Sequence, residues 1–305
     1  MKALVIGYGS IGLRHANILE KLGCHVAVMS RRIIDFNPCF NDIPTALHSF
    51  HPEYVVVANR TSEHFDTIKA LAEYGFNGYL LVEKPLFETP ADLPANDFSL
   101  FAVAYNLRFH PVLVRLKKFM SSTSIKPITA DIYAGSYLPE WRPGRDYSRS
   151  YSAKKNEGGG VLRDLSHELD YVYWLFGQWL RLTAMGGHFS TLDIETEDAC
   201  SLLMETLHCP LVSIHMNYLD RIPRREIIMN SDRHTVKADL INNTFSINNS
   251  PEVFAVNRDD TYCRQHQCIL EGRSKELCTA EEALETVYTI KAAEKAIYMN
   301  CWVER

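Results

Sequence analysis

The sequence predicts an α/β protein of two domains, a doubly wound parallel sheet followed by a mostly antiparallel sheet. The chain has 305 residues, which at roughly 150 residues per domain is enough for two domains. Short apolar runs alternate with helical stretches up to about residue 105, which is typical of βαβ units. After about residue 126, β-type runs follow one another with few long helices between them, which indicates antiparallel pairing.

The first domain is placed at residues 1–111. Its predicted strands are 2–6, 25–30, 54–59, 79–82 and 100–105, and its clearest helices are 11–22 and 63–74. Gly23 and Gly75 end these two helices, and Thr61 and Ser62 can cap the second. The run at 54–59 is rich in valine, as expected of a parallel strand buried on both faces.

The second domain is placed at residues 112–279. Predicted strands lie at 128–133, 199–205, 211–216 and 244–247, and one strong helix is expected over 160–176, ending at Gly177. A capping box, Thr279-x-x-Glu282, starts a C-terminal helix at 280–305. We expect this helix to pack back near the first domain.

Composition excludes several classes of protein. The formal charge is −5, from 32 basic and 37 acidic residues, so no basic footprint for nucleic acid is present. The longest apolar runs, such as 100–105 and 171–176, are too short to cross a membrane. Eight scattered cysteines without a C-x-x-C pair favour a cytoplasmic protein with reduced thiols, and no Cys/His spacing suggests a metal site.

A glycine-rich turn predicts a dinucleotide site. Gly7-x-Gly9-x-x-Gly12 follows the first strand and opens a helix, so its backbone, with Ser10 and Ile11, can hold a pyrophosphate at the helix N-terminus. The first domain is therefore predicted to be a Rossmann domain. A glycine-rich structural turn is the alternative.

The residues after the second strand favour NADP over NAD. An NAD site usually has an acidic residue there for the ribose 2′-hydroxyl, whereas this chain has Ser30, Arg31 and Arg32. Two arginines and a serine suit a 2′-phosphate. The alternative is that both arginines are solvated, or that one stacks on adenine, with NAD as cofactor.

A lysine follows the fourth strand, within Glu83-Lys84-Pro85. The carboxyl ends of parallel strands face the ligand crevice, so Lys84 can reach the reacting centre and polarise a substrate oxygen. Asn59, which ends the third strand, is assigned to the cofactor site together with Glu83 and Lys84.

The most informative stretch is Gly158-Gly159-Gly160 followed by Asp164 and His167. On one helix these two residues share a face. His167 can exchange a proton with an alcohol or ketone while hydride moves, and Asp164 can orient His167 or bind a substrate hydroxyl. The alternative for His167 is a structural histidine satisfied by a neighbour.

The loop at 135–157 mixes aromatic and basic residues, as binding loops often do. Trp141, Arg142 and Tyr151 are assigned to substrate, which the loop could take as a sugar nucleotide, a sugar phosphate or an acidic sugar. Packing on a neighbouring subunit is the alternative. Asn106 and Arg108 are further substrate candidates, with inter-domain packing as their alternative, and His110 is a second choice of acid–base group.

These motifs, in this order and together with Tyr105-Asn106-Leu107-Arg108-Phe109, resemble the glucose–fructose oxidoreductase/inositol dehydrogenase/MocA (Gfo/Idh/MocA) family over essentially the whole chain. The resemblance implies a Rossmann domain joined to a domain with a large open sheet that forms a dimer or tetramer. Lys84, Asp164 and His167 fall on the family's catalytic residues, although the family's common spacing is Asp-x-x-x-His. The Trp-Arg-Pro loop is similar to that of members from bacterial surface-sugar pathways.

The predicted function is therefore an NAD(P)-dependent oxidoreductase, with NADP favoured. It would move a hydride between nicotinamide and a secondary alcohol or ketone of a sugar, sugar nucleotide or cyclitol. Two alternatives stay open: a lyase or glycosidase that oxidises transiently with tightly bound NAD(P), and a non-catalytic NAD(P)-binding regulatory protein.

Overall fold

The computed structural model describes residues 1–122 and 125–305, which divide into two compact units. Unit 1 contains residues 1–109 and 258–284, and unit 2 contains residues 110–257 and 285–305. The first boundary lies two residues from the predicted one. Residues 258–279, placed in the second domain from the sequence, cluster with unit 1, and most of the C-terminal helix clusters with unit 2.

Unit 1 is built on a seven-stranded sheet of order β15-β6-β5-β4-β1-β2-β3. Its strands are β1 (Lys2–Ile6), β2 (His25–Met29), β3 (Cys39–Phe40), β4 (Tyr54–Val57), β5 (Tyr79–Val82), β6 (Leu100–Val103) and β15 (Cys278–Thr279). All pairings are parallel except that of the edge strand β15 with β6. The four residues of β4 are fully buried, because strands in such sheets are covered on both faces. The predicted parallel sheet is confirmed.

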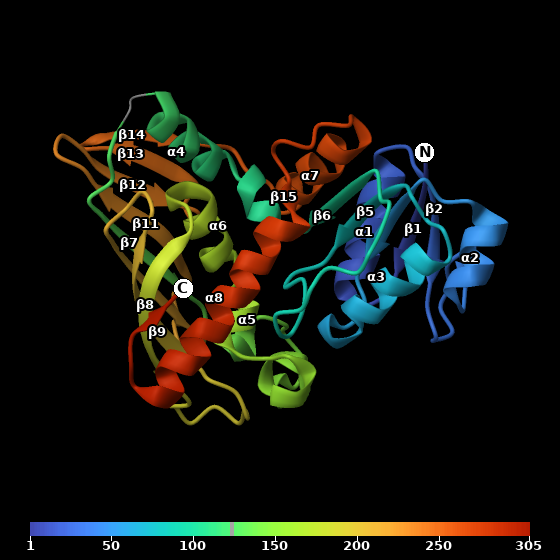
Figure 1. Ribbon diagram of the computed structural model, residues 1–305, viewed down its shortest axis with the longest axis horizontal. Helices are drawn as coiled ribbons and strands as arrows, with labels where there is room; N and C mark the ends of the chain where they lie inside the picture. The colour runs from blue at the N-terminus through green and yellow to red at the C-terminus, as the bar shows by residue number, and fades with distance from the viewer. Residues whose placement is uncertain (123–124) are drawn as a thin grey trace. The chain divides into compact units, whose positions relative to one another are not determined.

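The helices of unit 1 are α1 (Ser10–Lys21), α2 (Ile43–Phe50), α3 (His64–Glu73) and α7 (Asp260–Leu270). Figure 1 shows α1 and α3 on opposite faces of the sheet. A helix at α2 was not predicted, although the sequence holds its signal. The Asp42 carboxylate accepts the Thr45 N–H at 2.8 Å, and Pro44 stands in the first turn, as at many helix starts.

Unit 2 is built on a nine-stranded sheet of order β14-β13-β12-β11-β7-β10-β9-β8-β16. Its strands are β7 (Thr129–Gly135), β8 (Trp179–Gly187), β9 (Ala199–Thr206), β10 (Leu211–Asn217), β11 (Arg224–Asn230), β12 (Thr235–Asp239), β13 (Thr244–Ile247), β14 (Ser250–Val253) and β16 (Val303–Glu304). Only β7 and β10 pair in parallel, and the other pairings are antiparallel. The predicted mostly antiparallel sheet is confirmed.

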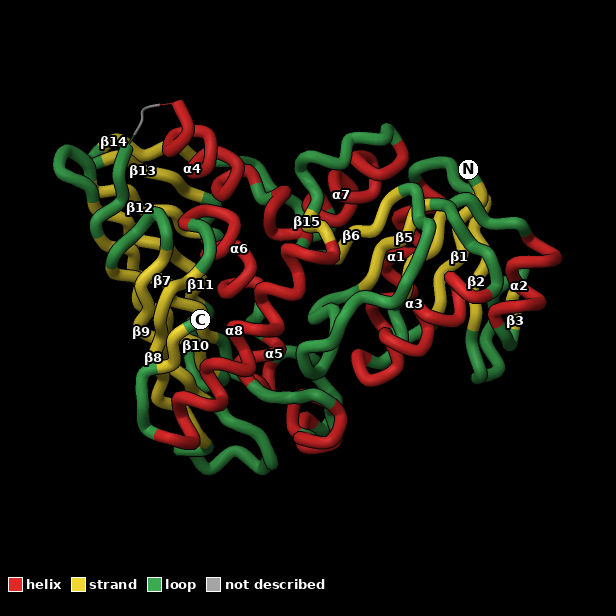
Figure 2. The backbone as a smooth tube through the Cα atoms, in the orientation of Figure 1, coloured by secondary structure: helices red, strands yellow, loops and turns green. Residues whose placement is uncertain are grey.

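Helices cover one face of the nine-stranded sheet. Figure 2 shows α4 (Pro111–Ser122), α5 (Val161–Asp164) and α6 (His167–Phe176) on the same side. Strand β9 alternates accordingly, with Leu202 and Met204 buried and Leu203 37% exposed between them, as expected where one face meets the core. The last helix, α8 (Ala280–Met299), begins in unit 1 and continues in unit 2.

The single helix expected over 160–176 is wrong, because Leu165 and Ser166 separate α5 from α6. Leu165 leaves helical geometry at φ −97° and ψ 30°. The Ser166 N–H bonds the Arg163 carbonyl, three residues back, and the Asp170 N–H bonds the Ser166 carbonyl, so a tight turn joins the helices. Asp164 therefore ends one helix and His167 begins the next.

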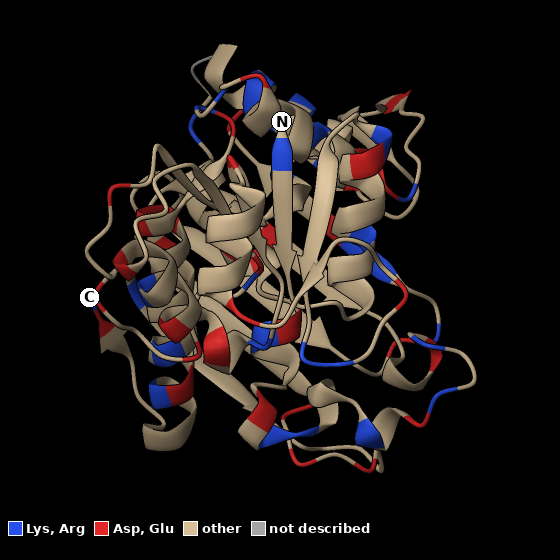
Figure 3. Cartoon of the chain, turned by 90° about the vertical axis from the view of Figure 1, so that its right-hand side faces the viewer, with Lys and Arg blue, Asp and Glu red and all other residues tan. Residues whose placement is uncertain are grey.

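The distribution of charge and of apolar residues is as follows. Figure 3 shows acidic and basic residues interspersed along the ribbon. Among the described residues, no helix is both long and apolar enough to span a bilayer.

Candidate functional site

The glycine turn forms an open backbone cradle at the start of α1. Gly7 has φ +94°, and a Cβ there would lie 2.6 Å from the Ala58 carbonyl oxygen. A Cβ on Gly12 would lie 1.9 Å from the Gly7 carbonyl oxygen. Gly9 has open space on the side where a Cβ would project. The Ser10 and Ile11 N–H groups at the helix start thus suit a bound anion.

The residues after β2 lie beside this cradle. The Arg32 guanidinium donates to the Tyr8 carbonyl oxygen at 2.8 Å, and the buried Ser30 hydroxyl accepts the Arg32 N–H at 3.1 Å. Arg31 is 81% exposed, with its nearest carboxylate oxygen, on Glu63, at 3.6 Å. Arg32 is thus fixed to the glycine turn, and Arg31 extends into solvent.

The residues that follow β4 and β5 are held by hydrogen bonds within unit 1. The Asn59 amide donates to Glu63 at 3.1 Å and to Thr67 at 2.9 Å. One Glu83 oxygen lies 2.7 Å from His15 Nε2, and the other accepts the Lys84 N–H at 3.2 Å. β1, β4 and β5 are parallel neighbours, so the glycine turn, Asn59 and Lys84 follow their strands at one edge of the sheet.

Asn106, Arg108 and His110 are buried and engaged in local packing. Asn106 donates to the Thr261 hydroxyl at 2.6 Å, and Arg108 pairs with Glu282 at 2.5 Å with 1% of its side chain exposed. His110 Nδ1 accepts the Val112 N–H at 3.3 Å, at the start of α4. The contacts of Asn106 and Arg108 therefore lie within unit 1, whereas the packing alternative was contact between the domains.

Asp164 is a buried carboxylate that accepts hydrogen bonds from two tyrosines. The Tyr218 hydroxyl donates to Asp164 at 2.7 Å, and the Tyr151 hydroxyl hydrogen-bonds the same carboxylate. The Asp164 charge and burial raise the pKa of Tyr151, while burial and then that charge raise the pKa of Tyr218. Both tyrosines therefore stay neutral donors. Tyr218 was missed because it lies 54 residues from Asp164 in the sequence.

A cavity of about 410 Å³ opens beside Asp164 in unit 2. Its wall includes Ser136, Trp141, Asp164, Arg224 and Arg225. The Trp141 indole N–H donates to the Ser136 hydroxyl at 2.8 Å, and its ring packs edge-on against Tyr218. The cavity thus combines a fixed aromatic surface with a carboxylate acceptor.

Arg225, a residue of this wall, forms an ion pair with Glu168. Glu168 has 0% side-chain exposure, and its Oε1 lies 2.8 Å from Arg225 Nε. The Tyr171 hydroxyl donates to the same oxygen at 3.3 Å. His167 is the first residue of α6 and partly buried, one residue before Glu168.

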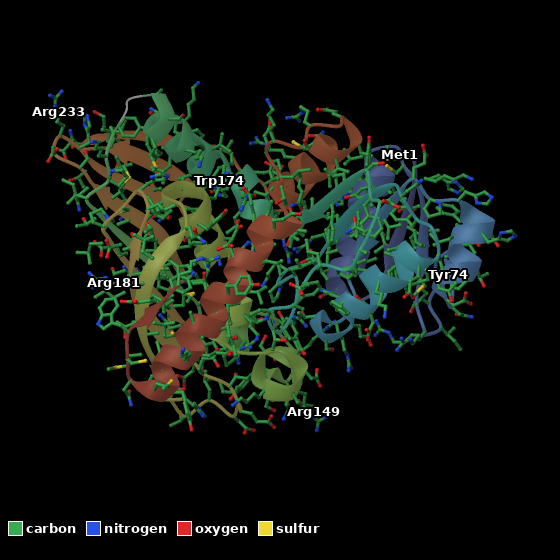
Figure 4. All side chains as sticks on the ribbon, viewed as in Figure 1. Met1, Tyr74, Arg149, Trp174, Arg181 and Arg233 are labelled. Atoms are coloured by element: carbon green, nitrogen blue, oxygen red, sulfur yellow. The ribbon has the colours of Figure 1, made fainter. Side chains whose placement is uncertain are left out.

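The predicted binding loop, 135–157, folds into four short 3₁₀ turns, at 138–140, 147–149, 151–153 and 155–157. The Arg142 guanidinium lies 5.9 Å from the centre of the Tyr151 ring, and Lys154 pairs with Glu195 at 3.1 Å. Arg149, labelled in Figure 4, is 87% exposed. Trp141 thus lines the cavity beside Asp164 and Tyr151 hydrogen-bonds Asp164, whereas Arg149 faces solvent.

Among residues 1–122 and 125–305, no group of three or more His, Cys, Asp or Glu side chains is placed to hold a metal ion.

Comparison with solved structures shows the same fold at low sequence identity. Levoglucosan dehydrogenase in complex with NADH superposes with a TM-score of 0.86 at 13% identity, covering 100% of this chain and 98% of that one. GenD2 from gentamicin A biosynthesis, in complex with NAD, gives 0.80 at 20% identity, covering 100% and 96%. An oxidoreductase from Agrobacterium radiobacter with NAD⁺, L-tartaric acid and magnesium gives 0.80 at 16% identity, covering 100% and 98%.

No curated protein matches the chain. Two family models match it, one in each part of the sequence. The model of the oxidoreductase family with an NAD-binding Rossmann fold matches residues 1–96, and the model of the GFO/IDH/MocA C-terminal domain matches residues 129–235. With both domains matched and the fold shared, this chain belongs to the GFO/IDH/MocA family of NAD-binding oxidoreductases.

Proposed function

We propose that this protein moves a hydride between NADP(H) and a secondary alcohol or ketone of a sugar-like substrate. The observation that carries the proposal is the shared sheet edge in unit 1, where the glycine turn follows β1 and Lys84 follows β5. The open space at Gly9 fits a pyrophosphate. When bound, the nicotinamide supplies or takes the hydride.

Each catalytic role is assigned to a residue of this chain. Lys84 donates a hydrogen bond to the reacting oxygen and stabilises its negative charge. His167 exchanges the proton of the alcohol with solvent. Asp164, held by Tyr151 and Tyr218, accepts a hydrogen bond from a substrate hydroxyl.

The cavity in unit 2 supports a sugar-like substrate. Trp141 offers a flat apolar surface for the C–H face of a ring, and Asp164 offers an acceptor for hydroxyls. A neighbouring structure contains levoglucosan, and another comes from a protein of gentamicin A biosynthesis. The levoglucosan ligand and the gentamicin A pathway of these two proteins both support a carbohydrate-related substrate.

Lys84→Met is expected to lower turnover by about a hundredfold to a thousandfold, because one preorganised donor to a developing oxyanion is lost. Hydride transfer from levoglucosan, myo-inositol, D-glucose and UDP-N-acetylglucosamine to NADP⁺ and NAD⁺ is followed at 340 nm to find the substrate and to compare the variants. Lys69→Met, on the exposed face of α3, is the control. Equal turnover in Lys84→Met and wild type would exclude the assigned role. Tightly retained cofactor without net turnover would favour a lyase or glycosidase.

The absence of an acid after β2 supports NADP as the preferred cofactor, although the neighbouring structures hold NAD or NADH. Arg31→Ala is expected to weaken NADPH binding about tenfold and leave NADH binding nearly unchanged, because only NADPH carries the 2′-phosphate. Fluorescence titration measures both affinities, with Arg149→Ala as control. Wild-type preference for NADH would refute the NADP assignment, and failure to bind either cofactor would favour a regulatory protein.

A further inference from the structure

A buried chain of hydrogen bonds in unit 1 joins three elements, β4, α7 and α1, and ends at the segment that carries Lys84. Tyr54 Oη of β4 lies 2.8 Å from His266 Nδ1 of α7. His266 Nε2 lies 2.8 Å from His15 Nδ1 of α1, and His15 Nε2 lies 2.7 Å from Glu83 Oε1. Tyr54, His15 and His266 are 0% exposed.

With an ionised Glu83 and one N–H on each histidine, the direction of every hydrogen bond follows. The Glu83 carboxylate only accepts, so His15 donates from Nε2. A neutral imidazole carries one N–H, so His15 Nδ1 accepts from His266 Nε2, and His266 Nδ1 accepts from the Tyr54 hydroxyl. Burial lowers the pKa of His266 well below its usual value and raises the pKa of Tyr54 well above its own, which keeps both groups neutral. Each of the three bonds then has one donor and one acceptor.

Glu83 connects this chain of hydrogen bonds to Lys84 through its second carboxylate oxygen. Oε2 accepts the Lys84 N–H at 3.2 Å while Oε1 is held by His15. Pro85 already restricts the backbone of the residue before it. With both carboxylate oxygens engaged, Glu83 fixes the peptide from which the lysine side chain projects.

Apolar side chains could fill the space of the two histidines without the cost of burying polar groups. A fully paired polar chain instead specifies one arrangement of the groups it joins. We propose that His15 is a positioning residue for Lys84, acting through Glu83, and that Tyr54 and His266 hold its proton on Nε2. This inference rests on the catalytic role proposed for Lys84.

Two substitutions at one position separate positioning from packing. The side-chain amide of Gln lies near the place of His Nε2, and that of Asn near the place of His Nδ1. His15→Gln therefore keeps a donor for Glu83, whereas His15→Asn keeps the contact with His266 and releases Glu83. Both variants lose the ring.

The measurement is the reactivity of Lys84 with trace acetic anhydride between pH 7 and pH 11, quantified by peptide mass spectrometry. It needs neither substrate nor cofactor. Loss of one hydrogen bond of ordinary strength is expected to change the Lys84 rate constant about fivefold in His15→Asn, against less than about twofold in His15→Gln. Lys69 and Lys291, both more than half exposed, serve as internal references.

Equal Lys84 reactivity in wild type and both variants, or an equal change in both variants, would overturn the proposal. Failure of NADPH to bind, with the Gln and Asn variants still differing, would leave the positioning role standing and remove only the proposed reaction.

A spectroscopic test on wild-type protein does not depend on how the His15 variants fold. In ¹⁵N-histidine spectra, His15 and His266 are expected to carry their protons on Nε2. Tyr54→Phe removes the donor to His266 Nδ1 and is expected to shift that nitrogen, whereas Tyr171→Phe, which removes a buried hydroxyl in unit 2, is the control. A proton on Nδ1 of His15 in wild type would contradict the assigned direction.

Discussion

Gly12→Ala is expected to destabilise the protein by about 3 kcal/mol or more, at the upper end for overpacked sites. The added Cβ would lie 1.9 Å from the Gly7 carbonyl oxygen and 2.9 Å from the Gly7 carbonyl carbon. Both atoms belong to backbone at the start of the Rossmann unit, so neither can rotate away as a side chain would. The free energy of unfolding from urea titration measures the effect.

Gly9→Ala is the matched control, and its expected result is the reverse. Gly9 has φ −83° and ψ −166°, which alanine adopts freely, and no atom lies within 4 Å of an added Cβ. Stability should change by less than about 0.5 kcal/mol, as for an unconstrained substitution. The methyl group would occupy space expected for the pyrophosphate, so NADPH affinity should fall roughly a hundredfold. Wild-type affinity in Gly9→Ala would contradict the assigned cradle.

Arg225→Met is expected to cost about 3 kcal/mol, at the lower end for breaking a buried ion pair. The Glu168 partner has 0% side-chain exposure, whereas Arg225 itself is 24% exposed. Removing the guanidinium leaves the carboxylate with the Tyr171 hydroxyl at 3.3 Å, and a buried charge without a cation is expensive. Urea denaturation at pH 7 measures the loss.

The neighbouring residue gives the control for this prediction. Arg224 is 48% exposed and pairs with Glu226 at the surface, so Arg224→Met should change stability by less than about 1 kcal/mol. Adding Glu168→Gln to Arg225→Met removes the unpaired charge and should recover at least about half of the lost stability. Equal losses in the two arginine variants would show that burial of Glu168 does not determine the effect.

Features set by local sequence were the ones that could be predicted. The glycine turn follows from spacing within 7–12, and the parallel sheet from the alternation of apolar runs with helical stretches. Lys84 could be placed at the ligand edge of the sheet because a strand end is a local signal whose place in a parallel sheet is known. These inferences need no knowledge of which distant segments meet.

Features that depend on distant segments were missed. The contact of Tyr218 with Asp164 spans 54 residues, and that of His266 with His15 spans 251. Nothing in the sequence around His266 indicates that this segment packs in unit 1. The segment could equally belong to the β-rich second domain. The break between α5 and α6 was missed for a different reason, because Leu165 and Ser166 are compatible with a continuous helix and a tight turn alike.

The division of unit 1 into two chain segments has a consequence for synthesis on the ribosome. Residues 1–109 emerge first, but β15 and α7 belong to 258–284. Until those residues emerge, β6 presents an unpaired sheet edge, and His15 lacks the histidine that orders its proton. While the nine-stranded unit is being synthesised, the exposed β6 edge of the seven-stranded sheet must therefore be kept from pairing with other chains. The first unit is therefore completed only after β15 and α7 have been synthesised.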